Sequence, residues 1–149
     1  MDLLALRSEL AKPGYVGLSD AEAAAAINAK TVTVQRPVAS ADARRYLMLV
    51  GKWPRIAGIA RGLITPANED QALSAVALVE GLSMIDSFDL EVPAYKAAVE
   101  AQLAACAATG LIAAEDTAAI MALADADVPG DHSFGRGVQP YDVSQARVS

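Results

Sequence analysis

Apolar residues recur at intervals of three and four along most of the chain, the spacing that places side chains on one face of a helix. The clearest such stripe consists of Tyr95, Val99, Leu103 and Cys106. The pattern predicts about six helices, over residues 3–12, 20–29, 41–52, 66–82, 93–109 and 115–126. We therefore expect an all-α fold, a compact bundle of about six short helices in which the last two form a hairpin.

Local start and stop signals support several of these helices. Ser19 and Glu22 have the spacing of a capping box, in which each side chain accepts a hydrogen bond from the other residue's backbone N–H. Thr65-Pro66 predicts another helix start, because proline suits the first helical position. Gly110 is the expected left-handed residue that ends the helix over residues 93–109.

Residues 30–38 break the helical pattern. This stretch contains four consecutive β-branched residues and then a basic residue and a proline, in the order Thr31, Val32, Thr33, Val34, Gln35, Arg36, Pro37. β-Branched residues favour extended backbone and proline lacks a ladder donor, so the stretch is an extended arm or a single edge strand. No second strand is evident to pair with it, and we expect the arm to contact a neighbouring protein.

The C-terminal region from residue 128 has no helical period and is rich in glycine and proline. We therefore expect a helical domain over residues 1–127 and an extended C-terminal tail over residues 128–149, with at most one helical turn at 142–147. Such a tail orders against its own domain or against another subunit, and we expect the second. Deleting residues 130–149 should then abolish incorporation into the assembly and leave the helicity measured by circular dichroism nearly unchanged.

Charge is unevenly distributed along the 149 residues, whose net charge is −6. Residues 1–29 carry −2, residues 30–61 carry +6 and residues 62–149 carry −10. This polarity favours complementary contacts between copies, or a basic face that meets an acidic partner. Alternatively, folding brings the two segments together and cancels much of the difference. The 54% of hydrophobic residues are largely alanine, which predicts a thin core.

Several classes of protein do not fit this sequence. No apolar run approaches the roughly 20 residues that cross a bilayer, and Asp2 stands where a secretory signal would be basic. The single cysteine, Cys106, excludes an internal disulfide and lies on an apolar stripe, so we expect it in the core. We expect a soluble protein made in a reducing cytoplasm.

Residue types used in catalysis and metal binding occur without the context that their chemistry needs. Asp131, His132 and Ser133 are the residues of a hydrolase triad, but triad members converge from separate parts of a fold. Asp125, Asp127 and Asp131 lie near a helix end without the glycine and glutamate of a calcium loop. We therefore expect no enzyme, no cofactor and no bound metal.

The basic segment at residues 30–61 supports an alternative function. Arg44 and Arg45, with Lys52 and Arg55 one to three turns further on, have a spacing that could follow a phosphate backbone. The chain is acidic overall, however, and Tyr46 suits the core side of its helix better than a base-stacking surface. A cytoplasmic regulator that binds nucleic acid is the alternative hypothesis.

Two stretches together suggest a family. Residues 17–23 read Gly-Leu-Ser-Asp-Ala-Glu-Ala and lead into the Thr/Val segment that ends at residue 34, and residues 138–147 contain Asp-Val and end in Ala-Arg. They resemble the opening and the ending of small uncharacterised proteins encoded in tailed-bacteriophage genomes. The resemblance covers about a quarter of the chain. It implies a virion component, such as a tail, connector or decoration subunit, and offers no catalytic residue.

The leading hypothesis is therefore a non-enzymatic structural or adaptor subunit of a bacteriophage virion, made in the host cytoplasm. Its partners would be other virion proteins and copies of itself, without nucleic acid or membrane. The predicted contact residues lie in the arm, the basic segment and the tail: Thr31, Val32, Thr33, Val34, Arg36, Arg44, Arg45, Arg55, Phe134, Arg136, Val138 and Tyr141.

Overall fold

The computed structural model describes residues 1–130, 134 and 136–149, and the chain forms two compact units. Unit 1 consists of residues 1–34 and 127–149, and unit 2 of residues 35–126. Unit 2 is thus inserted into unit 1, whose two halves are the two ends of the chain. This division differs from the predicted one, because residues 127–149 belong with the first 34 residues instead of forming a separate tail.

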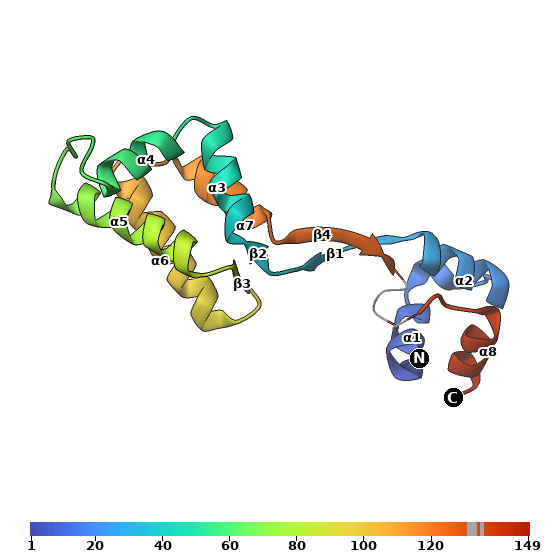
Figure 1. The fold of residues 1–149 in the computed structure, drawn as a ribbon. Coiled ribbons are helices and arrows are strands. Elements are labelled where there is room, and N and C mark those ends of the chain that lie inside the picture. The colour runs from blue at the N-terminus through green and yellow to red at the C-terminus, as the bar shows by residue number, and fades with distance from the viewer. Residues whose placement is uncertain (131–133, 135) are drawn as a thin grey trace. The chain divides into compact units, whose positions relative to one another are not determined.

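Unit 1 is a cluster of three short α-helices, α1 (Leu3–Leu10), α2 (Asp20–Ala29) and α8 (Pro140–Val148), with a 3-10 helix, η1 (Pro13–Tyr15), between α1 and α2 (Figure 1). Its buried core includes Leu6, Ile27 and Val143, each at most 1% exposed. The prediction of an extended C-terminal tail is wrong for residues 140–148. Pro140 occupies the first turn of α8, where a missing N–H costs nothing, and the spacing of Val143 and Ala146 turns both into the core.

Unit 2 contains five helices and a small sheet (Figure 1). The helices are α3 (Ser40–Leu49), α4 (Trp53–Ala60), α5 (Glu69–Met84), α6 (Pro93–Ala108) and α7 (Ala114–Ala122). Strand β2 (Val38–Ala39) pairs antiparallel with β3 (Ser87–Phe88). Leu47 and Ile56 are fully buried in the core, and Cys106 is too, as its place on the apolar stripe predicts.

Two of the helix signals are confirmed and one is wrong. The capping box of Ser19 and Glu22 forms at the start of α2, and Gly110 has a positive φ of 77° after α6. Helix α5, however, begins at Glu69 instead of Pro66. Asn68 caps it by accepting a hydrogen bond from the Gln71 N–H at 2.9 Å. The buried Gln71 fixes this start, because its amide also donates to the Thr109 carbonyl of unit 2 at 2.7 Å.

The arm predicted at residues 30–38 has a partner. Strand β1 (Thr31–Gln35) pairs with β4 (Asp125–Pro129), and the Thr33 hydroxyl donates to Asp127 at 2.8 Å. The helix predicted to reach residue 126 ends at Ala122, and the second strand begins within its expected last turn and continues into the expected tail. The described residues are therefore helix-rich, with eight α-helices, but carry two short sheets that an all-α fold lacks.

Candidate docking site

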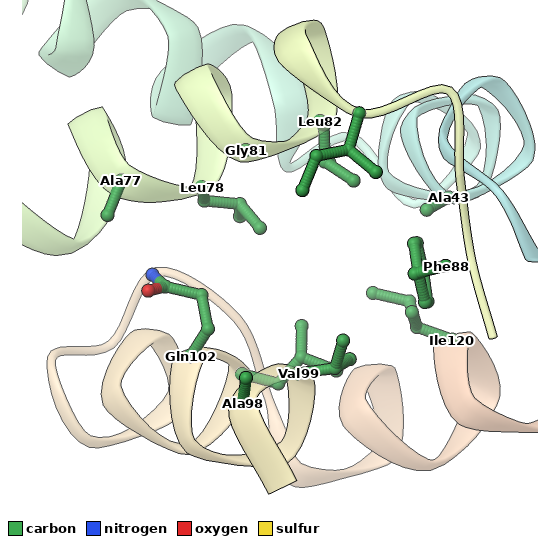
Figure 2. A pocket seen from close by; sticks show the side chains of 12 residues that line it. Ala43, Ala77, Leu78, Gly81, Leu82, Phe88, Ala98, Val99, Gln102 and Ile120 are labelled. Atoms are coloured by element: carbon green, nitrogen blue, oxygen red, sulfur yellow. The ribbon is translucent and has the colours of Figure 1, made fainter. Parts of the chain in front are cut away.

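An apolar cleft lies between α5 and α6 of unit 2 (Figure 2). Its volume is about 210 Å³, smaller than the roughly 300–1,000 Å³ typical of small-molecule sites. The lining side chains come from α3, α5, α6, α7 and the segment between α5 and α6: Ala43, Ala77, Leu78, Gly81, Leu82, Ile85, Phe88, Ala98, Val99, Gln102, Leu103 and Ile120. We call this the α5–α6 cleft.

Small residues keep the α5–α6 cleft open. Ala77 and Gly81 lie one turn apart on α5, and Ala98 lies on α6; Figure 2 shows these small residues bordering the cleft. A Cβ atom built on Gly81 would meet no heavy atom within 4 Å. Because glycine in a helix interior costs about 1 kcal/mol relative to alanine, unit 2 is less stable at this position than it could be.

The polar groups in and behind the α5–α6 cleft are few and weakly reactive. Gln102 contributes the only side-chain amide of the lining, and its Nε2 donates to the Ser74 carbonyl at 3.4 Å. Cys106 lies in the core behind it, fully buried, and burial raises the pKa of its thiol. A thiol with a raised pKa holds little thiolate, so Cys106 suits packing better than nucleophilic catalysis.

The segment that closes one end of the α5–α6 cleft is acidic. Residues 85–92 connect α5 to α6 and contribute Ile85 and Phe88 to the lining. The same eight residues contain Asp86, Asp89 and Glu91 and no lysine or arginine. We call residues 85–92 the acidic connector. A partner that inserts apolar side chains here would gain from basic residues beside them.

A second concave surface of unit 2 is basic. It is lined by Ala41, Arg44, Arg45, Met48, Trp53, Arg61, Val79 and Ser83. Arg45 pairs with Asp42 at 3.0 Å, whereas Arg44 and Arg61 have no carboxylate of the described residues within 4 Å. We call this the arginine surface.

The arginine surface and the α5–α6 cleft lie on different sides of α5, although Leu78 and Leu82 of the cleft are only about 100° around the helix from the residues of the arginine surface. Val79 and Ser83 line the first, and Gly81 and Ile85 line the second. A two-residue offset corresponds to a rotation of about 200° around the helix axis.

A buried carboxylate joins α7 to α3 and α4. Asp116, 5% exposed, accepts hydrogen bonds from the Tyr46 hydroxyl at 2.8 Å and from the Lys52 ammonium at 2.5 Å. Burial raises its pKa, but Lys52, the backbone N–H of Ala113 and Tyr46 together outweigh this and hold the pKa below its usual value. The cluster is fully paired within unit 2, so its evident role is to fix these helices.

The predicted contact residues of the arm and the basic segment are spread over several elements. Thr31, Val32, Thr33 and Val34 belong to β1, and the backbone N–H of Arg36 donates to the Ala124 carbonyl at 2.7 Å. Arg44 and Arg45 meet at the arginine surface, which Arg61 completes. Arg55 is exposed on α4 and does not line that surface.

Two of the four predicted contact residues of the tail are buried. Phe134 and Val138 are 7% and 1% exposed in the core of unit 1, which removes both from the surface. Sequence reasoning placed them outside because it assumed an extended tail. Tyr141 is 70% exposed, and its hydroxyl accepts a hydrogen bond from Gln145 at 2.7 Å.

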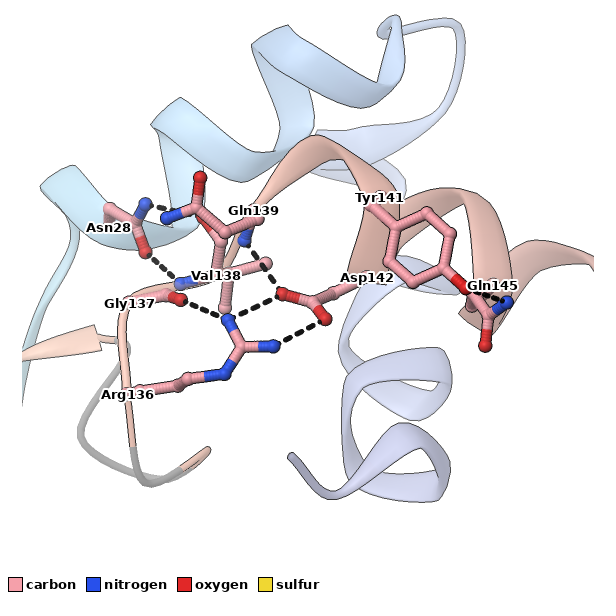
Figure 3. Close-up of polar contacts among 8 residues, drawn as sticks. All are labelled: Asn28, Arg136, Gly137, Val138, Gln139, Tyr141, Asp142 and Gln145. Carbon is pink, nitrogen blue, oxygen red and sulfur yellow. Dashed lines mark hydrogen bonds and ion pairs between the residues drawn. The ribbon is translucent and has the colours of Figure 1, made fainter.

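Polar contacts hold α8 in unit 1 (Figure 3). Arg136 forms a bidentate pair with the buried Asp142, at 2.7 and 2.9 Å, and this pair is the main cause of the lowered pKa of Asp142. The Asn28 side chain donates to the carbonyl of Val138 and accepts from its N–H, both at 2.9 Å. Arg136 thus has a partner within its own unit.

The described residues give no support to the catalytic and metal-binding motifs considered from the sequence. Asp131, His132 and Ser133 lie outside the described residues. No group of three or more metal-ligating side chains gathers within the residues that the structure describes. Asp125 and Asp127 accept hydrogen bonds from Gln35 and Thr33.

Comparisons with known proteins add no assignment. No protein-family model, curated protein or solved structure matches the chain. Across the described part of the chain, no helix has the length and apolar character to cross a bilayer.

Sequence reasoning missed the α5–α6 cleft itself. The predicted stripe faces the core at Leu103 and Cys106, but its first residue, Tyr95, is 58% exposed. The small residues across the cleft from Val99 were counted only as helix formers. The available signal was Gly81, a single glycine in the middle of an otherwise helical pattern. A glycine at such a position lowers helix stability, so it indicates a special packing requirement there.

Proposed function

We propose that the protein is a non-enzymatic structural or adaptor subunit of a bacteriophage virion that docks other proteins through the α5–α6 cleft. The observation that carries this proposal is the cleft itself, an opening lined almost entirely by apolar side chains. A partner that covers this exposed apolar surface gains binding free energy, about 25 cal/mol per Å² of apolar surface removed from water. The resemblance of residues 17–34 and 138–147 to phage-encoded proteins supports the virion setting.

The partner chemistry follows from the lining and the acidic connector. An apolar side chain of the partner would fill the space beside Gly81 and Ala98, and a neighbouring lysine or arginine would face Asp86 or Asp89. Helix-in-groove recognition uses this combination, with apolar anchors at helical spacing. The proposed partner is therefore a helix that carries apolar and basic residues on one face.

The test compares two substitutions on α6. Ala98→Arg places a long charged side chain in the α5–α6 cleft, whereas Ala104→Arg makes the same change at an exposed position of α6 that does not line it. Each variant replaces the wild-type protein in infected cells, and particles purified by density gradient are analysed by mass spectrometry. We expect the wild-type chain and Ala104→Arg in the particles and Ala98→Arg absent from them. Equal incorporation of Ala98→Arg, or particles without the wild-type chain, would overturn the proposal.

One observation favours a second function, nucleic-acid binding. Arg44, Arg45 and Arg61 converge on one concave surface beside Trp53, as a phosphate-binding face requires. Duplex or single-stranded DNA that binds the wild-type protein, weakens steeply with salt and is lost on Arg44→Glu/Arg45→Glu would support this alternative. Indifference to both nucleic acids would exclude it.

A further inference from the structure

We infer that the α5–α6 cleft receives the outer face of α3 from a second copy of this chain, so that copies join head to tail. The inference rests on the proposed function and names the partner of the same cleft.

The outer face of α3 has the chemistry that the cleft requires. Met48 and Leu49 are 60% and 81% exposed at the end of α3, although both are large and apolar. Arg44 and Arg45 lie four residues before them, and residues four apart share one face of a helix. The face thus carries two apolar side chains with a basic residue one turn from each, the combination proposed for the partner helix.

Charge determines which surfaces can meet. A symmetric contact of the arginine surface with itself would oppose arginines, and a symmetric contact of the cleft would oppose two acidic connectors. Only a contact between the α3 face of one copy and the cleft of another brings Arg44 and Arg45 toward Asp86 and Asp89. Complementary charge favours this heterologous arrangement over both symmetric ones.

The position of the two surfaces allows the contact to repeat. Because α5 separates the cleft from the arginine surface, a copy whose cleft is filled still presents its own α3 face. Heterologous contacts of this kind produce rings when the rotation closes and filaments when it does not. Either product would be suitable for a component present in several copies in a particle.

The experiment uses two variants of the 149-residue chain, each of which loses one surface. Ala98→Arg blocks the cleft and leaves the α3 face unchanged. Arg44→Glu/Arg45→Glu reverses the charge of the α3 face and leaves the cleft unchanged. Ala104→Arg and Arg7→Glu are the controls, since both change exposed residues, of α6 and α1, that line neither surface. Sedimentation velocity over a range of concentrations measures self-association, and circular dichroism verifies that each variant is folded.

We expect the wild-type protein and both controls to self-associate, more weakly at high salt, and each blocking variant to lose about tenfold or more in affinity. An equimolar mixture of the two blocking variants should form a complex of two chains, because one supplies the α3 face and the other the cleft. A symmetric interface would give no such complex. A mixture that stays at the mass of one chain overturns the inference.

The outcomes separate this inference from the proposed function. A wild-type protein that remains a single chain at all concentrations, while Ala98→Arg is lost from particles, overturns head-to-tail association and leaves docking to another virion protein in place. If Ala98→Arg enters particles as well as wild type, the proposed function fails whatever the self-association shows.

Discussion

The two units of this protein differ in how completely their helices are packed against one another. Unit 1 buries the apolar side of α1 and α2 under α8, so the two ends of the chain close the core together. Unit 2 has a core of its own around Leu47 and Ile56, yet leaves an apolar cleft open between α5 and α6. Unit 1 therefore gives a structural role to residues that were expected to bind partners, and unit 2 carries both surfaces that we propose for docking.

The difference extends to the polar contacts. In unit 1, side chains far apart in sequence hold α8, as with Asn28 and Val138, which are separated by 110 residues. In unit 2, the exposed basic residues of the arginine surface are only partly paired among the described residues. Buried polar pairs specify a fold, whereas unpaired surface charges are free to select a partner.

The largest expected effect comes from removing α8. Deleting residues 138–149 takes Val138, Val143 and Ala146 out of the core of unit 1, and short helices such as α1 and α2 are marginal without packing. We expect unit 1 to lose its helices, measured as reduced helical circular dichroism and lost amide protection in α1 and α2. This reverses the expectation, based on sequence, that the last 20 residues contribute little to helicity. Deleting only Val148 and Ser149, both exposed, should change neither signal.

A smaller loss is expected from Asp116→Asn in unit 2. The substitution leaves the ammonium of Lys52 beside a neutral group, and we expect a loss of about 1–3 kcal/mol, since Lys52 is one-third exposed and partly solvated. The control is Asp42→Asn, whose pair with Arg45 lies on the surface and should contribute less than about 1 kcal/mol. Urea unfolding at pH 7 measures both.

The pH dependence of the same variant has a defined sign. Because the folded protein holds the pKa of Asp116 below its usual value, its charged form stabilises the fold above the unfolded pKa of about 4. This contribution disappears as the pH falls through the lower, folded pKa. The stability difference between wild type and Asp116→Asn should therefore be constant near neutrality and shrink below about pH 4. A difference that grows on acidification would contradict this assignment.

Asn28→Ala should cost about 1–2 kcal/mol, all of it in unit 1. The change removes two hydrogen bonds to the backbone of Val138 and leaves its partly buried N–H and carbonyl groups without these partners. Hydrogen exchange should increase first in α8. Gln145→Ala, which removes only the exposed bond to Tyr141, is the control and should stay within about 0.5 kcal/mol of wild type.

The smallest effect is a gain. Gly81→Ala should stabilise unit 2 by about 0.5–1 kcal/mol, because the new Cβ meets nothing within 4 Å and alanine favours the helix. The same methyl group narrows the α5–α6 cleft, so self-association should weaken while the melting temperature rises. Ala104→Gly on the exposed side of α6 should lower stability by a similar amount and leave association unchanged. If Gly81→Ala strengthens association, the cleft is not the docking surface.

The candidate surfaces could be predicted only in part. The basic face of α3 followed from helical spacing alone, since Arg44 and Arg45 lie opposite the apolar side that contains Leu47. The α5–α6 cleft did not, because an empty space depends on the separation of two helices and not on the pattern within either. The acidic connector was counted only within the net charge of residues 62–149, which did not indicate its place beside a cleft.

The sequence by itself determined the local structure of this protein. The capping box at Ser19, the start of α6 at Pro93 and the turn at Gly110 depend on hydrogen bonds and dihedral angles within a few residues, which neighbouring side chains decide. Tertiary structure decided the pairing of β1 with β4 and the return of α8 to α1 and α2. These contacts join segments about 90 or more residues apart, so their formation depends on what the intervening chain folds into, and no local pattern records it.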